Sequence, residues 1–137
     1  MNTESQDKII RNKDKGNAFY RYYKSLLHAI DGIIYSIKYE HNMIIIVTAM
    51  IVVIGAGFFF KISAYEWLFC ITVMSLVAGA ELINTSIEAL VDLCTSEIHP
   101  LAKVAKDCAS SASLIFSIGS LVGGLIIFIP KIIEFFF

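Results

Sequence analysis

Carboxylates and an amide recur at helical spacing along one otherwise apolar stretch, residues 80–92. An α-helix turns about 100° per residue, so side chains three, four and seven positions apart lie on one face. On a helix, one face of this stretch, about 100° wide, carries Glu81, Asn84, Thr85, Glu88 and Asp92. Ionisable side chains inside a membrane cost several kcal/mol and usually have a function. The face is therefore predicted to do chemistry.

A second polar face follows at residues 103–110, with Lys103, Lys106, Asp107 and Ser110 at helical spacing. Carboxylate and amide oxygens suit Mg²⁺ and do not suit zinc or copper. Lysines, and a helix amino end near Pro100, suit phosphate oxygens. Together the two faces predict a site for Mg²⁺ and a nucleotide, and phosphoryl transfer to a membrane-borne acceptor. The chain contains no Walker A or kinase glycine-rich loop, which excludes a classical soluble nucleotide fold.

The bulk composition indicates a membrane protein. The chain has 137 residues, enough for one domain, and is 57% hydrophobic with a mean hydropathy of +0.72. A net charge of −1 makes nucleic acid an unexpected partner. The three cysteines have no metal-binding spacing, so we expect them to be reduced packing residues. No secretory signal is expected, because the first seventeen residues are polar.

The hydrophobic pattern predicts an all-α membrane protein. Residues 1–17 are expected to be a polar tail, and residues 18–137 a single membrane domain. Its predicted elements are an amphipathic helix in the membrane interface at 18–40 and transmembrane helices at 43–60, 65–95 and 100–130. An alternative for the first helix is packing on a soluble partner. Pro130 and Lys131 are expected to end the last span.

Basic residues predict the orientation of the chain. Seven Lys and Arg residues precede Met43, and Lys103 and Lys106 lie at the start of the third span, whereas only Lys61 and Lys131 fall on the other side. The positive-inside rule therefore places the N-terminus and the polar site in the cytoplasm. Three helices enclose little volume, so an oligomer is expected. The Gly- and Ser-rich face of the third span is expected to pack between subunits.

Two motifs then resemble a known family. They are Glu81-Leu-Ile-Asn-Thr-Ser-Ile-Glu-Ala-Leu-Val-Asp92 and His99-Pro-Leu-Ala-Lys-Val-Ala-Lys-Asp107. This pair closely resembles the prokaryotic diacylglycerol kinases, small trimeric three-helix lipid kinases that include the undecaprenol kinases. The resemblance covers roughly residues 21–130. It implies a homotrimer in the bacterial cytoplasmic membrane that phosphorylates undecaprenol or diacylglycerol with Mg-ATP, and it leaves the choice of acceptor open.

The resemblance also implies a role for individual residues. Glu81 would be the catalytic base and Asn84 would position groups of the active site. Glu40 and Glu88 would hold Mg²⁺. The residues implied to contact the nucleotide or its metal are Arg21, His28, Glu40, Glu88, Glu97, His99, Lys106 and Asp107. Those implied to lie near the lipid are Arg21, Glu81 and Ser110. His28 stands where some members carry Tyr, and Ser86 replaces a commoner Ala.

Simpler interpretations of the same residues stay open. Lys106 and Asp107 could form only a local ion pair, and His99 could be only a helix cap. Glu40 and Asp92 could be solvated charges at helix ends.

Two other functions are also open for the whole chain. A small ion or proton transporter would place acids near mid-membrane, whereas here they cluster toward one end. A non-catalytic scaffold or sensor descended from a kinase would have lost some of the motif residues, all of which are present. A site shared between neighbouring subunits is a further hypothesis.

Overall fold

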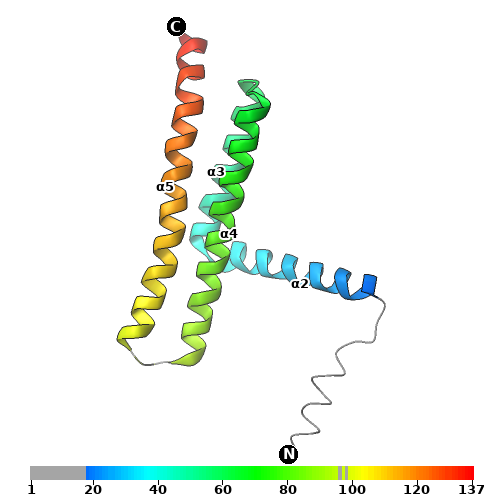
Figure 1. The fold of residues 1–137 in the computed structure, drawn as a ribbon, viewed down its shortest axis with the longest axis vertical. Helices are drawn as coiled ribbons and strands as arrows, with labels where there is room; N and C mark the ends of the chain where they lie inside the picture. The colour runs from blue at the N-terminus through cyan, green and yellow to red at the C-terminus, as the bar shows by residue number, and fades with distance from the viewer. Residues whose placement is uncertain (1–17, 96, 98) are drawn as a thin grey trace, which may run out of the picture. The chain divides into compact units, whose positions relative to one another are not determined.

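A computed structural model describes residues 18–95, 97 and 99–137 of the chain. The predicted tail, residues 1–17, lies outside the described residues, as do Ser96 and Ile98 of the predicted turn. The described elements are four α-helices (Figure 1). This confirms the predicted all-α fold. The described chain divides into two units, with the boundary between residues 34 and 35.

Helix α2, Ala18–Tyr39, makes up the described part of the first unit and runs into the second. Large apolar and aromatic side chains on it, such as Phe19 and Tyr22, are widely exposed. Polar side chains alternate with them at helical spacing, and His28 Nδ1 lies 3.9 Å from Asp31 Oδ2, one turn away. A helix with these two kinds of surface suits a membrane interface. The range 18–40 predicted for it differs from the observed helix by one residue.

The second unit contains three helices that are long and apolar enough to cross a membrane. They are α3 (His41–Phe59), α4 (Ala64–Cys94) and α5 (Pro100–Phe136). At 1.5 Å per residue α4 is about 46 Å long, whereas a hydrocarbon core is about 30 Å thick. One end of α4 therefore has to lie outside the hydrocarbon.

Helices α4 and α5 run antiparallel and side by side, with a short connection at one end, and α3 packs on α4 (Figure 1). Close contact depends on small residues. A Cβ atom at Gly123 would lie 2.2 Å from the ring of Phe69, and one at Gly57 would lie 2.7 Å from the ring of Trp67. Glycine at these positions lets an aromatic ring of α4 approach the backbone of a neighbouring helix.

Local signals set the helix ends. Ser63 and Glu66 form a capping box at the start of α4, in which each side chain binds the other residue's backbone N–H. His99 caps α5 and Pro100 occupies its first turn.

The far end of α5 differs from the prediction, because the helix continues through Pro130 to Phe136. Proline removes one helical hydrogen bond. Tertiary contacts hold the last turns in place: Lys131 Nζ lies 3.1 Å from Glu66 Oε1, and the ring of Phe135 packs on those of Phe59 and Phe60.

Candidate functional site

The buried polar side chains of the described residues gather at one place in the second unit. They are Ser36, Glu81, Asn84, Thr85 and Ser113. Three of them lie on the predicted face of α4, and the other two reach that face from the end of α2 and from α5. Burial of polar groups costs free energy unless they find partners. Their concentration here therefore marks this part of the molecule as the candidate site.

Glu81 is the one ionisable residue of this set, and 3% of its surface is exposed. The hydroxyl of Ser113 on α5 donates a hydrogen bond of 2.5 Å to Glu81 Oε2. Thr85 Oγ1, one turn along α4, donates to the backbone carbonyl of Glu81 at 3.1 Å and lies 3.4 Å from Ser36 Oγ. These contacts tie Glu81 to a second helix and join the end of α2 to α4 at the same level.

Asn84 and Glu88 form the next turn of this face. Asn84 Nδ2 donates to Glu88 Oε1 at 3.0 Å. The other amide atom, Asn84 Oδ1, is buried and has no hydrogen-bond partner among the residues that the structure describes. A buried acceptor without a partner costs roughly 1–3 kcal/mol, so this oxygen is suited to receive a ligand.

Two ion pairs extend the polar surface toward the connection between α4 and α5. Lys106 Nζ binds Asp92 Oδ1 at 2.5 Å, and Lys103 Nζ binds Asp107 Oδ2 at 3.1 Å. The second pair lies within one helix, four residues apart. The predicted alternative of a pair between Lys106 and Asp107 is not what forms. Instead Lys106 reaches across to α4, and Asp92 has a partner.

A cavity of about 290 Å³ opens beside Glu81. Its lining is mostly polar on the α5 side, where Ser110, Ser113 and Ser117 follow one another along the helix. The remaining lining residues are Asn42, Ile45, Ile46 and Leu114.

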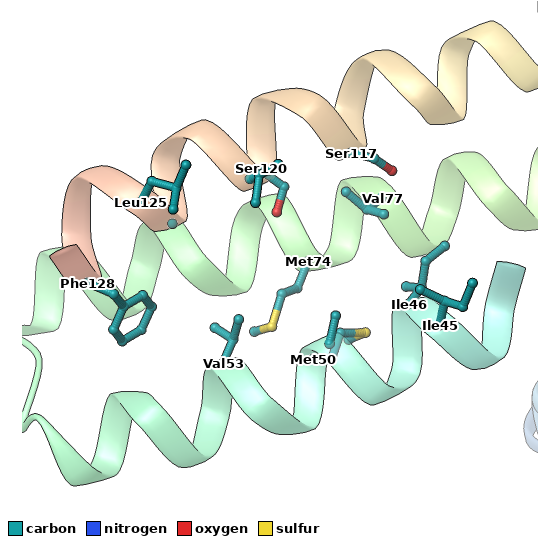
Figure 2. Close-up of a pocket in the computed structure, with 13 residues that line it drawn as sticks. Ile45, Ile46, Met50, Val53, Met74, Val77, Ser117, Ser120, Leu125 and Phe128 are labelled. Atoms are coloured by element: carbon teal, nitrogen blue, oxygen red, sulfur yellow. The ribbon is translucent and has the colours of Figure 1, made fainter. Parts of the chain in front are cut away.

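A second cavity, of about 370 Å³, shares Ile45, Ile46 and Ser117 with the first and is lined mainly by apolar side chains. Figure 2 shows Met50 and Val53 of α3 and Met74 of α4 in this space between the helices. A cavity with several polar side chains beside an apolar cavity that shares part of its lining can take a molecule with a polar head and an apolar chain.

The donor set near Glu88 fits Mg²⁺. Among the described residues, no three His, Cys, Asp or Glu side chains lie close enough together to hold a metal ion. Mg²⁺ bound with a nucleotide usually takes one or two carboxylates, and phosphate and water oxygens complete its ligands. One carboxylate at Glu88, oriented by Asn84 and beside the unpartnered Oδ1, meets that need.

The other predicted site residues lie in different surroundings. Glu40 is half-buried and precedes α3 at its cap position without a capping hydrogen bond from its side chain. Glu97 is exposed in the connection, and its N–H donates to Thr95 Oγ1 at 3.1 Å. His99 Nδ1 accepts from the N–H of Leu101 at 3.2 Å, as a helix cap does. Arg21 and His28 lie on the first unit.

Sequence reasoning missed Ser113 and Ser36. The Ser-rich face of α5 was expected to serve packing between subunits, yet Ser113 contacts Glu81 within the chain. A signal was present, because Lys106, Ser110, Ser113 and Ser117 are spaced by four, three and four residues and so share one face. Ser36 gave no such signal, since its contact with Thr85 joins positions 49 residues apart.

Comparison with known proteins identifies the family to which the sequence is similar. Residues 27–128 match the sequence pattern of the family described as prokaryotic diacylglycerol kinase. An undecaprenol kinase of Bacillus subtilis (strain 168) is 39% identical over 120 residues, which cover 88% of this chain and 98% of that protein. A diacylglycerol kinase of Helicobacter pylori (strain J99) is 39% identical over 102 residues, 74% of this chain and 79% of that protein.

A more distant relative is a diacylglycerol kinase of Synechocystis, 31% identical over 111 residues. The family match includes Glu81, Asn84, Glu88, Lys106 and Asp107 within its bounds. The chain belongs to the prokaryotic diacylglycerol kinase family, and is thus a phosphotransferase with an alcohol acceptor.

Proposed function

We propose that this protein phosphorylates the hydroxyl of a membrane lipid alcohol with Mg-ATP at the cytoplasmic face of a bacterial membrane, and that undecaprenol is its preferred acceptor. The observation that carries the proposal is the position of Glu81. Its buried carboxylate lines a cavity that has several polar side chains and shares lining residues with an apolar cavity. A lipid alcohol has a hydroxyl for the first cavity and a chain for the second.

In the proposed reaction Glu81 is the general base. The acceptor's hydroxyl gives its proton to the carboxylate as its oxygen forms a bond to the γ-phosphorus. The bond from that phosphorus to the bridging oxygen breaks, and ADP leaves. Ser110 lines the same cavity as Glu81, which supports the proposal that it lies near the lipid headgroup.

Glu88 and Glu40 are proposed to hold Mg²⁺, with Asn84 orienting the Glu88 carboxylate. The ion, when bound, offsets the negative charge of the transferring phosphoryl group. The Asn84 amide keeps Glu88 in one orientation, and its free Oδ1 is available to a ligand of the bound ion or to the nucleotide.

Lys106 is proposed to bind phosphate oxygens of ATP as a point charge. Asp107 follows Lys106 in α5, and His99 and Glu97 lie at the start of that helix and in the connection before it. These three residues are proposed to complete the nucleotide site. Lys106 is paired with Asp92 in the described structure, so ATP has to compete with that carboxylate. Arg21 and His28 are proposed to reach the substrates from the interfacial helix.

The cytoplasmic placement rests on the distribution of basic residues, most of which precede α3 or start α5. A homotrimer, the assembly that the family resemblance implies, is also proposed. The outer faces of the three long helices expose many large apolar side chains, such as Ile51, Leu76 and Ile115, which lipid or neighbouring subunits would cover.

Undecaprenol is preferred because the match to the Bacillus subtilis undecaprenol kinase extends over 98% of that protein, whereas the match to the Helicobacter pylori diacylglycerol kinase extends over 79%. The test is a transfer assay in mixed micelles with Mg-ATP, in which undecaprenol and dioleoylglycerol are offered separately and in competition. A higher kcat/KM for undecaprenol supports the proposal. A higher value for dioleoylglycerol contradicts the acceptor choice, and transfer to neither contradicts the kinase function.

A further inference from the structure

The hydroxyl of Ser113 behaves differently from other hydroxyls on these helices. Serine and threonine inside a helix usually donate to the carbonyl four residues earlier. Five described residues of α3, α4 and α5 do so at 2.7 to 2.8 Å: Thr48, Thr72, Ser75, Ser86 and Ser111. Ser113 instead donates to a side chain 32 residues away, Glu81 Oε2, at 2.5 Å.

The hydrogen bond between Ser113 and Glu81 lies in buried surroundings, where it can hold the Glu81 side chain in one orientation. Glu81 and Ser113 are 3% and 7% exposed, so little water competes for either group. A hydrogen bond in such surroundings is electrostatically stronger than one in water. It joins α4 to α5 and engages one carboxylate oxygen, and among the described residues the other oxygen, Oε1, has no hydrogen-bond partner.

Both residues line the cavity proposed for the acceptor's head. A glutamate side chain has three rotatable bonds, and its carboxylate has to be held still to accept a proton efficiently. The other turns of α5 at the cavity carry Ser110 and Ser117, but among the described residues the α5 hydrogen bond to Glu81 comes from Ser113. Ser113 is therefore the α5 group that fixes where the Glu81 carboxylate points.

We infer that Ser113 is a positioning residue for phosphoryl transfer: it holds Glu81 Oε2 so that Oε1 faces the hydroxyl of the lipid in the cavity. The Ser113 proton stays on its own oxygen, and Oε1 receives the proton of the acceptor. This inference rests on the proposed function, since it assigns Ser113 to the same reaction.

The experiment compares Ser113→Ala, Ser113→Thr and Ser111→Ala with the full-length wild-type protein in undecaprenol micelles. Ser113→Ala is expected to lower kcat roughly tenfold to a hundredfold, with the KM values for Mg-ATP and undecaprenol changed less than about twofold. Ser113→Thr keeps the hydroxyl, and the cavity that Ser113 lines offers space for the added methyl group. We therefore expect kcat to return to within about threefold of wild type. Ser111→Ala, which loses only a bond to its own helix, should match wild type.

Each outcome counts for or against Ser113 separately from the kinase function. An active wild type with a fully active Ser113→Ala overturns the positioning role and leaves the kinase function standing. A change in both KM values with kcat intact also overturns it, because that pattern reports substrate binding. An inactive wild type removes both. If Ser113→Ala does not fold, Ser113→Cys takes its place, because a thiol of similar size is only a weak donor. A kcat lowered at least about fivefold in the folded Ser113→Cys protein then supports the role, and a kcat equal to that of wild type overturns it.

Discussion

Two of the carboxylates by which helix α4 contacts α5, Glu66 in its first turn and Glu81 just past its middle, are held in different ways. Glu66, near the start of the helix, accepts from the backbone N–H of Ser63 at 2.6 Å and pairs with Lys131 at 3.1 Å. Glu81 is more deeply buried, yet its α5 partner is one neutral hydroxyl. A buried charge without a countercharge is a poor device for stability. From this difference we propose that Glu66 holds the helices together, whereas Glu81 serves the chemistry.

The largest expected effect separates these two carboxylates. Glu81→Gln should lower kcat about a thousandfold or more, because the amide cannot accept the acceptor's proton. Binding of Mg-ATP, measured by equilibrium dialysis, should change little. Glu66→Gln is the matched control and should leave kcat unchanged. Equal losses of kcat in both variants would contradict the assignment of chemistry to Glu81 and of stability to Glu66.

The next effect concerns the turn after Glu81. Glu88→Gln should raise the Mg²⁺ concentration needed for half-maximal activity by at least about tenfold. Loss of a residue that only hydrogen-bonds to a metal ligand already lowers metal affinity about tenfold or more, and Glu88 is proposed to be a ligand itself. A Mg²⁺ titration of the initial rate at fixed ATP measures it. Ser86→Ala, on the same helix, is the control and should titrate like wild type. An unchanged Mg²⁺ titration of Glu88→Gln would remove Glu88 from the proposed metal site.

Beside Glu66, in the first turn of α4, the variant Lys131→Met should affect stability and not activity. It removes the countercharge of Glu66 and one link between α4 and the turns of α5 beyond Pro130. A Tm lowered by a few degrees in detergent, with kcat and both KM values unchanged, is the expected result. A large fall in kcat at a temperature where the variant is fully folded would show that the Lys131–Glu66 pair also affects the site around Glu81.

The smallest effect is expected at the ion pair of Lys106. Asp92→Asn removes the carboxylate that competes with ATP for Lys106, but both side chains are at least one-third exposed and such pairs are worth little. The KM for Mg-ATP should therefore fall only about two- to fivefold. A rise in that KM would instead indicate that Asp92 holds Lys106 in its binding position.

The sequence predicted which residues share the polar face around Glu81, but it did not predict what that face contacts. Helical periodicity identified the face with Glu81, Asn84 and Glu88, because it depends only on local geometry. The contacts of that face with Ser113 and Ser36 depend on how α4 meets α5 and the end of α2. Local spacing carries no information on such pairings across helices.

The Glu66 end shows the opposite limit. Pro130 followed by Lys131 was expected to end the last span, since proline removes a helical hydrogen bond. The helix continues because Lys131 binds Glu66 and Phe135 packs on the rings of α3's last turn and beyond. Tertiary contacts outweigh a local helix-breaking signal there, and a sequence pattern read along one segment could not include them.

The most direct test of the central claim is a single-turnover measurement on wild type and Glu81→Gln. Each protein is loaded with Mg-ATP, mixed with an excess of undecaprenol in micelles, and quenched at increasing times. We expect equal amounts of bound ATP and a transfer rate constant about a thousandfold or more lower in Glu81→Gln. Equal rate constants in the two proteins would contradict the claim that the buried Glu81 activates the lipid hydroxyl.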